Sequence, residues 1–549
     1  SVTELPMLPP ELGAADVRAP QYAALGNFLV RQVDVVIAIW DGQVAAGPGG
    51  TAVVVGQAIE AGCLVIWIDP ADPATPKLLD GDRAAMAPRD FSRPLTPVVL
   101  TEILQGMLLP LAAEAEPNAA NAGSEDVVPS YFKARWPGAV HWAVGYSLLR
   151  LLGGGRRWKW PLRYDSYEAL AAAWTPFLAG TPKGSGSSGG RFDSRIRDVL
   201  LPRSVWADAL AWYYGQLYRS AYVTTFILGG LAVPVGLCYL FFASSPDVLD
   251  IKAGFATAEL AVIMGIVLLV RRGGRRKWHK LWLETREMSE LLRLGRSLAY
   301  VGELRELTQG GSGKSGSSSL PVLYARATFR EIGLPNAVLD SDYLRMVLGT
   351  TLETELREQK TYHEKNAAEL ERIDHALHRI GNACFTATVL VTAAFLGGWV
   401  IDLIVNGHDA GLAAAGHEVS LAVGGHEAAL AVGGHEAEAP DWGEWFHEFL
   451  EYFLKPLVSI LAAGLPAFGA AFAGIRAQSN FGDLSRRSEA TFDELSDVEE
   501  RIASLTTGPE RKIGLASAAE ALLGFTHAMA ADLGSWRQLY VQKPLVLPG

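Results

Sequence analysis

The sequence predicts a membrane α-helical protein with four transmembrane helices, long cytoplasmic helices and a partial α/β domain at its N-terminus. Three observations support this fold class. Hydrophobic residues make up 49% of the 549 residues although 19% are charged, which indicates apolar blocks within polar sequence. Lysine and arginine are distributed unevenly around those blocks. A strand-loop-helix-strand pattern precedes them.

Four apolar runs are the candidate membrane spans: residues 221–243, 253–270, 384–405 and 454–475. Crossing about 30 Å of hydrocarbon takes roughly 20 helical residues. The first, third and fourth runs meet that length. The shorter second run is interpreted as a span because it lies directly beside the first, and a buried soluble helix is its alternative. Residues 1–24 contain no signal-peptide pattern, so these internal runs are expected to direct insertion.

The charge distribution predicts the orientation of these spans, because positive residues favour the cytoplasmic side of a membrane helix. The second span is followed at once by Arg271, Arg272, Arg275 and Arg276, whereas residues 401–454 contain neither lysine nor arginine. Both hairpins are therefore expected to start and end in the cytoplasm. We expect a multi-pass protein of the bacterial inner (cytoplasmic) membrane with both termini cytoplasmic and the lipid bilayer as a partner.

Apolar stripes continue the third and fourth spans. Residues three or four apart precede the third span at Leu370, Ile373, Leu377 and Ile380, and others follow the fourth at Phe492, Leu495, Val498, Ile502 and Leu505. Stripes of this kind pack in helical bundles or coiled coils. Packing within one chain and an oligomeric stalk are both open at this point, and a homo-oligomer is expected.

Glu259 lies inside the second span and is the main intramembrane candidate for function. A carboxylate in hydrocarbon is costly and usually faces a partner or water. If the span begins later than residue 253, Glu259 is instead interfacial.

The loop at 406–453 carries a nine-residue repeat with a histidine-acid pair in each unit, at His408, His417, His426 and His435. Imidazole binds zinc and copper. Nine residues make about 2.5 helical turns, so successive histidines would face opposite sides of a helix. A metal site is therefore the weaker interpretation, and a repeat without a role is favoured.

The expected domain organisation follows from these segments. It comprises an α/β domain at 1–130, a connector at 131–205, the first hairpin with its cytoplasmic extensions at 206–310, a flexible linker at 311–340, the second hairpin at 341–510, and a C-terminal helix and tail at 511–549. The net charge of −11 argues against nucleic acid as a partner, because phosphate binding needs a basic face. Only three cysteines occur, far apart, so no disulfide framework or CxxC site is expected.

The α/β domain contains a glycine-rich loop between a strand at 34–42 and a helix ending near residue 61. A second strand follows at 64–69. Exposed backbone N–H groups at a helix N-terminus bind anions, and glycines allow phosphate to approach closely. The candidate ligand-binding residues are Trp40, Asp41, Gly42, Gly47, Gly49, Gly50 and Thr51. A turn that binds nothing is the alternative, and no cofactor is expected besides a possible nucleotide ligand.

In this region the sequence resembles the SLOG superfamily of Rossmann-like nucleotide-sensing and nucleotide-processing domains. The resemblance covers residues 24–27, 34–42, 47–51 and 65–69, and corresponds to the second half of such a domain. Members that hydrolyse nucleotides carry a PGG-x-GT-x-x-E pattern. Here Thr51 is followed by Ala52, Val53 and Val54, with no glutamate in that place. The resemblance therefore implies sensing rather than hydrolysis.

The membrane half is similar to SLATT-type transmembrane effector domains, which are predicted pore-formers paired with nucleotide sensors in bacterial conflict systems. The matching residues are Trp212–Tyr214, Tyr218–Ser220, Trp278–Trp282, Arg286, Trp536, Arg537 and Lys543–Leu545. Together the resemblances imply a pore or channel gated by a nucleotide-derived small molecule. Two alternatives stay open: a structural or scaffold subunit of a membrane complex, and a membrane-tethered nucleotide hydrolase that uses Asp41 or Asp69.

Overall fold

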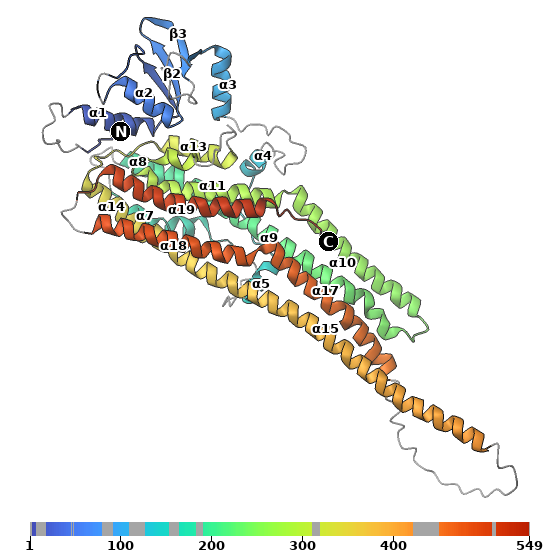
Figure 1. Ribbon diagram of the computed structural model, residues 1–549. Coiled ribbons are helices and arrows are strands. Elements are labelled where there is room, and N and C mark those ends of the chain that lie inside the picture. The colour runs from blue at the N-terminus through green and yellow to red at the C-terminus, as the bar shows by residue number, and fades with distance from the viewer. Residues whose placement is uncertain are drawn as a thin grey trace.

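The computed structural model describes residues 3–6, 18–45, 47, 49–79, 92–108, 127–152, 164–182, 190–309, 319–420, 449–507 and 512–547. A small N-terminal α/β unit lies at one end of a long array of helices, and α15 extends beyond the others at the opposite end (Figure 1). Most of the described chain is helical, with a single small sheet near the N-terminus.

The α/β unit contains the predicted parallel strand-loop-helix-strand arrangement. Its elements are α1 (Arg18–Val30), β1 (Val35–Ile39), α2 (Thr51–Glu60), β2 (Leu64–Asp69), β3 (Asp72–Leu79), β4 (Ser92–Pro94) and α3 (Pro97–Leu108). The strand order is β1-β2-β3-β4, in which β1 and β2 are parallel and the other pairs antiparallel. The sheet is therefore mixed, and β1 is an edge strand among the described residues.

Charged contacts attach this unit to the helices below it. Arg31 pairs with Glu303 at 3.0 Å, and Arg330 pairs with Asp34 at 2.5 Å. Arg305 donates hydrogen bonds to the carbonyl oxygens of Val30 and Ala61, at 3.0 and 3.2 Å. These contacts gather where β1 begins, so the glycine-rich loop after β1 lies at the far end of the strand.

The helical part begins with short helices and continues with long ones. The short helices are α4 (Val127–Phe132), α5 (Gly145–Leu152), α6 (Tyr167–Ala172), α7 (Thr175–Gly180), α8 (Gly190–Arg195), α12 (Leu304–Gln309), α13 (Leu320–Ile332) and α14 (Ser341–Thr351). The long helices are α9 (Leu201–Leu237), α10 (Val248–Arg275), α11 (Trp278–Ala299), α15 (Arg357–Ser420), α17 (Lys455–Ser479), α18 (Phe481–Thr506) and α19 (Leu515–Val541). Three π-helical segments, Ile196–Leu200, Leu352–Leu356 and Phe449–Leu454, lead into α9, α15 and α17, and a 3₁₀ segment, Cys238–Phe242, ends α9.

Within the described residues, four helical stretches are long and apolar enough to cross a membrane. They contain α9, α10, α15 and α17, as the sequence predicted. In their most apolar 18-residue windows only 17%, 6%, 0% and 22% of the residues, respectively, are buried. Their apolar side chains therefore point mostly outward, as expected of helices surrounded by lipid.

The apolar helices form a layer in the order α10, α9, α17, α15, in which each is packed extensively on the next. Small residues of α17 allow close packing on both of its neighbours. Gly464 lies against Pro234 and Gly474 against Phe226 of α9, whereas Gly469 lies against Phe385 of α15. A row of helices has no interior, so the described spans of one chain enclose no channel.

The apolar stripes pack within the chain. Leu370, Ile373 and Leu377 of α15 are buried in one core cluster, and Leu495 and Ile502 of α18 in another. The first cluster also contains Tyr218, Trp282 and Tyr540 of α9, α11 and α19, and the second contains Leu344 and Phe525 of α14 and α19. Intramolecular packing is thus the outcome for these stripes.

The segment at 311–340, expected to be a flexible linker, contains a helix. α13 begins after Ser319, has Pro321 in its first turn, and buries Ala325, Phe329 and Ile332. α13 packs on α11, whose Gly295 leaves room for the Phe329 ring. The expectation rested on the glycine- and serine-rich residues before α13. It was wrong for α13 itself, because the apolar face of this helix packs on α11.

A buried ion pair connects the base of α15 to the rest of the helical core. Arg296 of α11 pairs with Glu355 at 2.5 Å, and both side chains are buried. Ser297 donates a second hydrogen bond to the same carboxylate oxygen, at 2.6 Å. The guanidinium also lies over the rings of Trp174 and Phe177, at 4.8 and 4.7 Å.

Replacing Arg296 by Met should lower the free energy of unfolding by about 3–5 kcal/mol, because Glu355 would keep a buried, uncompensated charge. The double variant Arg296→Met/Glu355→Leu removes both charges and should recover most of that loss. Thermal unfolding of the purified variants, followed by near-UV circular dichroism, measures both. Equal losses in the single and double variants would contradict this account.

Candidate functional site

The loop after β1 is organised by its own polar groups. Asp41 Oδ1 accepts a hydrogen bond from the backbone N–H of Gln43 at 3.0 Å. Gly42 has a φ of +75°, a conformation that glycine adopts without strain. Asp69, at the end of β2, likewise accepts from the N–H of Ala71 at 2.9 Å. Each carboxylate thus holds a turn at the carboxyl edge of the parallel strands.

Trp40 is part of the core of the α/β unit. Its side chain is buried, and its indole N–H donates to the carbonyl oxygen of Gln43 at 3.0 Å. Trp67 in turn donates to the carbonyl oxygen of Trp40 at 2.7 Å. Trp40 therefore supports the base of the loop, and the loop surface is made by the residues after it.

The glycines of the loop differ in what they do. A side chain at Gly49 would collide with Tyr22 and the backbone of Ala19, so Gly49 permits the loop to pack on α1. Gly47 has nothing within 4 Å of where a Cβ would lie, and Gly50 meets only the Gly47 oxygen at 3.7 Å. Gly49 thus has a packing role, while the surface around Gly47 and Gly50 is open.

The first turn of α2 faces this open surface. Gly50 is the N-cap with φ −78° and ψ 163°, and no side chain caps the helix. Thr51 begins the helix and is exposed. Uncapped N–H groups at a helix start together with the helix dipole favour an anion. The loop can therefore hold a phosphate-sized anion through backbone groups.

Glu259 faces α9 rather than the surroundings. Its carboxylate occupies the space that a side chain at Gly236 would need, so the glycine makes room for it. Gly236 lies one residue before the end of α9, directly before the 3₁₀ segment. Glu259 of α10 therefore packs against the C-terminal end of α9.

The histidine repeat lies at the end of α15 and beyond it. The backbone at His408 and His417 is helical, their side chains are not described, and His426 and His435 lie outside the described residues. Among the residues that the structure does describe, no three His, Cys, Asp or Glu side chains form a group that could hold a metal ion.

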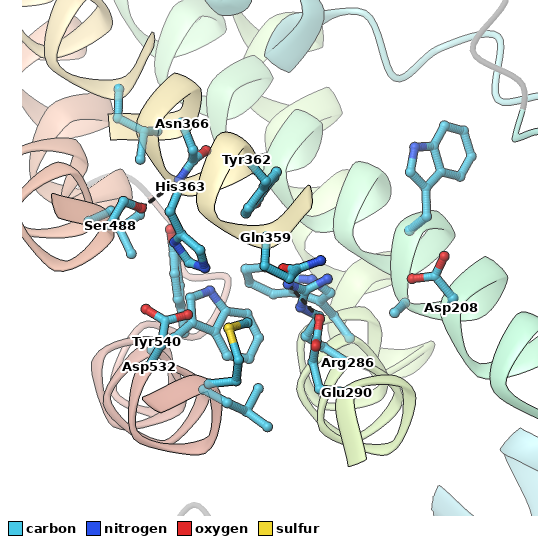
Figure 2. Close-up of a pocket in the computed structure, with 18 of the residues that line it drawn as sticks. Asp208, Arg286, Glu290, Gln359, Tyr362, His363, Asn366, Ser488, Asp532 and Tyr540 are labelled. Carbon is cyan, nitrogen blue, oxygen red and sulfur yellow. Dashed lines mark hydrogen bonds and ion pairs between the residues drawn. The ribbon is translucent and has the colours of Figure 1, made fainter. Parts of the chain in front are cut away.

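The structure also contains a polar cavity that the sequence did not reveal. It has a volume of about 260 Å³ and lies between α9, α11, α15, α18 and α19 (Figure 2). Aromatic side chains form much of its wall, at Tyr146, Tyr164, Trp212, Trp282, Tyr362, Trp536 and Tyr540.

Charged groups from α11 line one side of the cavity. Glu290 pairs with Arg286 at 2.9 Å and with Arg293 at 2.5 Å. Burial alone would raise the pKa of Glu290, but the two guanidinium groups outweigh it and hold that pKa at about 2. Glu290 is therefore ionised at neutral pH, and its charge is balanced within α11.

His363 of α15 projects into the same cavity (Figure 2). Its side chain is only 3% exposed, and neither ring nitrogen has a hydrogen-bond partner in the described structure. Burial lowers the pKa of His363 to about 4, because the charged imidazolium would lose its hydration. A buried polar group without a partner is uncommon and indicates a site that a ligand or water completes.

Two aspartates complete the cavity. Asp208 of α9 accepts hydrogen bonds from Tyr164 and, at 3.2 Å, from Ser289. Asp532 of α19 has one long hydrogen bond, at 3.5 Å, from Thr491. Burial raises the pKa of Asp532 above its usual range, although Arg286 opposes this effect.

The sequence held only a faint signal for this cavity. Arg286 and Glu290 have the i,i+4 spacing of a helical ion pair, a pattern that is common on solvated helices. His363 and Asp532 lie far apart along the chain, on helices whose relative register no local pattern reveals.

No family model, curated protein or solved structure matches this sequence.

His363 should make the protein sensitive to mild acid. Its pKa of about 4 lies below the value of about 6.5 in an unfolded chain, so the unfolded state binds more protons between these values. Stability present above pH 6.5 should fall by up to about 3 kcal/mol as the pH drops toward 4. Glu290 titrates below this window.

Thermal unfolding at pH 7.5 and pH 4.5, for the parent protein and His363→Leu, measures this effect. The parent should lose more stability than the variant, since all other titrating groups are common to both. An equal pH dependence in the two proteins would show that His363 is not the responsible group.

Proposed function

We propose that this chain is a multi-pass effector of the bacterial inner membrane whose pore or channel is opened by a nucleotide-derived ligand. The ligand would bind at Gly47, Gly50 and Thr51, where uncapped N–H groups and an open loop favour an anionic phosphate. Four helices with largely unburied apolar surface support insertion in a bilayer. Both termini and the α/β unit would lie in the cytoplasm, on the side of the arginines after α10.

The observation that carries the proposal is the continuity of the long helices. α9 runs from the buried cytoplasmic core at Leu201 to Leu237 in the first apolar stretch. α15 likewise begins beside the core at Arg357 and continues through the third apolar stretch. A change in the packing of the cytoplasmic helices would therefore displace the membrane segments as rigid bodies.

A physical connection leads from the loop to the apolar helices. The loop packs on α1 through Gly49, and the end of α1 is tied to the turn after α11 through Arg31 and Glu303. α11 begins at Trp278, directly after α10. A ligand that binds one arrangement of α1 and α2 more tightly would shift the position of α11 and α10.

A pore would have to form between copies of the chain. One chain arranges its apolar helices in a row, with α10 and α15 at the edges. A closed ring of such rows surrounds a central path, as cyclic homo-oligomers do. This arrangement supports the homo-oligomer that we propose.

Liposomes that contain the purified protein should leak ions when nucleotides are added to the cytoplasmic face. Gly50→Asp should abolish this response, because it places a negative charge at the proposed anion site. Gly50→Ala should retain most of it. Both side chains fit the open space and the extended backbone at this N-cap, but alanine adds neither a charge nor a capping oxygen and leaves the N–H groups of the first turn uncapped.

Tight liposomes under every nucleotide, with inserted and folded protein, would contradict the effector proposal. Leakage that Gly50→Asp leaves intact would contradict only the site. Nucleotide turnover that is lost in Asp41→Ala or Asp69→Ala would favour the tethered hydrolase.

Cysteine labelling tests the proposed orientation. After the three native cysteines are replaced by Ser, Ser244→Cys, in the segment between α9 and α10, should react with an impermeant maleimide in intact spheroplasts. Glu494→Cys, exposed on α18, should react only after permeabilisation. The reverse pattern would contradict the orientation, and equal labelling of both sites in intact spheroplasts would contradict insertion.

A further inference from the structure

The cavity between α9, α11, α15, α18 and α19 has aromatic walls. Trp282 stacks on Tyr218 at 5.1 Å and meets Trp536 and Tyr540 edge-on, at 5.0 and 4.9 Å. The rings of Tyr164 and Trp212 contact each other with their centroids 5.0 Å apart. These contacts fix the rings, so the walls are preformed and do not need to be ordered by a ligand. Rigid aromatic surfaces favour a planar guest.

The charges in the cavity favour a neutral guest. Its lining carries the carboxylates of Asp208, Glu290 and Asp532 but only the guanidinium groups of Arg219 and Arg286. Arg219 is already held over the rings of Tyr146 and Trp282, with Nε donating to the Gly215 oxygen at 3.1 Å. Arg286 is paired with Glu290. The positive groups of the lining are already engaged, so a phosphate would have to displace a carboxylate or an aromatic ring to gain a guanidinium partner.

Hydrogen-bonding capacity remains at one edge of the cavity. A neutral imidazole offers one donor and one acceptor, and both His363 nitrogens are without a partner in the described structure. Asp532 on the facing helix offers further acceptor positions. A ring that carries an N–H beside an unprotonated ring nitrogen complements this edge.

We infer that this cavity is a second ligand site, which binds a small, neutral, planar heteroaromatic molecule of nucleobase or nucleoside size. The aromatic walls hold its faces, and His363 and Asp532 recognise its hydrogen-bonding edge. The volume of about 260 Å³ is slightly below the roughly 300–1,000 Å³ typical of drug-sized ligand sites, and it excludes a dinucleotide. This site is separate from the glycine-rich loop and does not depend on the function proposed there.

The position of the cavity gives such a ligand a route to the membrane. Its walls come from α9 and α15, which continue into apolar stretches, and from α11 and α18, which directly follow α10 and α17. A bound ring would change the distances between the cytoplasmic ends of the four apolar helices. The ligand would therefore set the spacing at which those helices enter the bilayer.

Isothermal titration calorimetry on the full chain in detergent micelles tests the inference. The probes are adenine, guanine, cytosine, uracil and their nucleosides, with AMP as the charged counterpart of adenosine. At least one neutral probe should bind saturably with a Kd below about 1 mM, and AMP should bind at least tenfold more weakly than adenosine if adenosine binds. Quenching of tryptophan fluorescence should accompany binding, since Trp212, Trp282 and Trp536 line the cavity.

Variants of two lining residues test whether the probe binds in this cavity. His363→Leu and Asp532→Asn should each weaken binding by about tenfold or more, as expected for a lost hydrogen bond to a buried or charged group. His375→Leu is the matched control, because His375 is exposed on the same helix, and it should bind like the parent. His363→Leu should leave the melting temperature unchanged or raise it at neutral pH, since it removes an unpartnered polar group.

Absence of saturable binding by every neutral probe would overturn the inference. Binding that survives both His363→Leu and Asp532→Asn, or that AMP shares with adenosine, would also overturn it. None of these outcomes depends on membrane leakage. They would therefore not contradict the ligand site proposed at the glycine-rich loop, which the liposome experiment tests separately.

Discussion

The backbone of α15 runs without a break from the buried core beside Arg296 into an apolar stretch whose most apolar window is fully unburied. Hydrocarbon offers no hydrogen-bond partners, so a span must satisfy its backbone internally, and an unbroken helix does so. The same helix also packs into the buried helical core at its N-terminal end. α9 likewise continues from that core into an apolar stretch. This continuity links the layer of apolar helices to the helical core.

The helical core combines two kinds of packing that stabilise it differently. Most of it is apolar, with Leu292, Leu344, Leu495 and Phe525 fully enclosed. The Arg296–Glu355 pair and the charged cavity around Glu290 interrupt that apolar packing. Buried charges cost desolvation free energy, and a buried histidine without a hydrogen-bond partner adds a smaller cost of the same kind. These buried polar groups lower the stability of the fold, and they form a polar site next to the apolar helices.

The α/β unit is attached to the surface of the helical core and does not insert between its helices. The end of α1 and the start of β1 contact the turn after α11 and the helix α13. Its glycine-rich loop lies at the opposite end of the strand and remains accessible. Ile37 and Ile39 of β1 are exposed on one sheet face, although a continuous apolar strand is typical of burial on both faces.

The sequence by itself determined the apolar helices and the parallel strand-loop-helix-strand unit, because each depends on a local pattern. Hydrophobic length predicts a span, and an apolar strand before a glycine-rich loop predicts a βαβ turn. The same local reasoning failed at α13, where the glycine- and serine-rich residues before it obscured a packed helix. It also could not show that Gly49 serves packing on α1 while Gly50 faces open space, since both look alike in a loop.

Only the tertiary structure decided which distant residues meet. The stripes at Leu370 and Leu495 were compatible with packing within or between chains, and the fold placed them in cores of one chain. Asp208, Glu290, His363 and Asp532 come from separate helices, and their convergence depends on the rotation and register of each helix in the bundle. That register is set by the summed packing of the whole core, a long-range quantity that no short segment of sequence encodes.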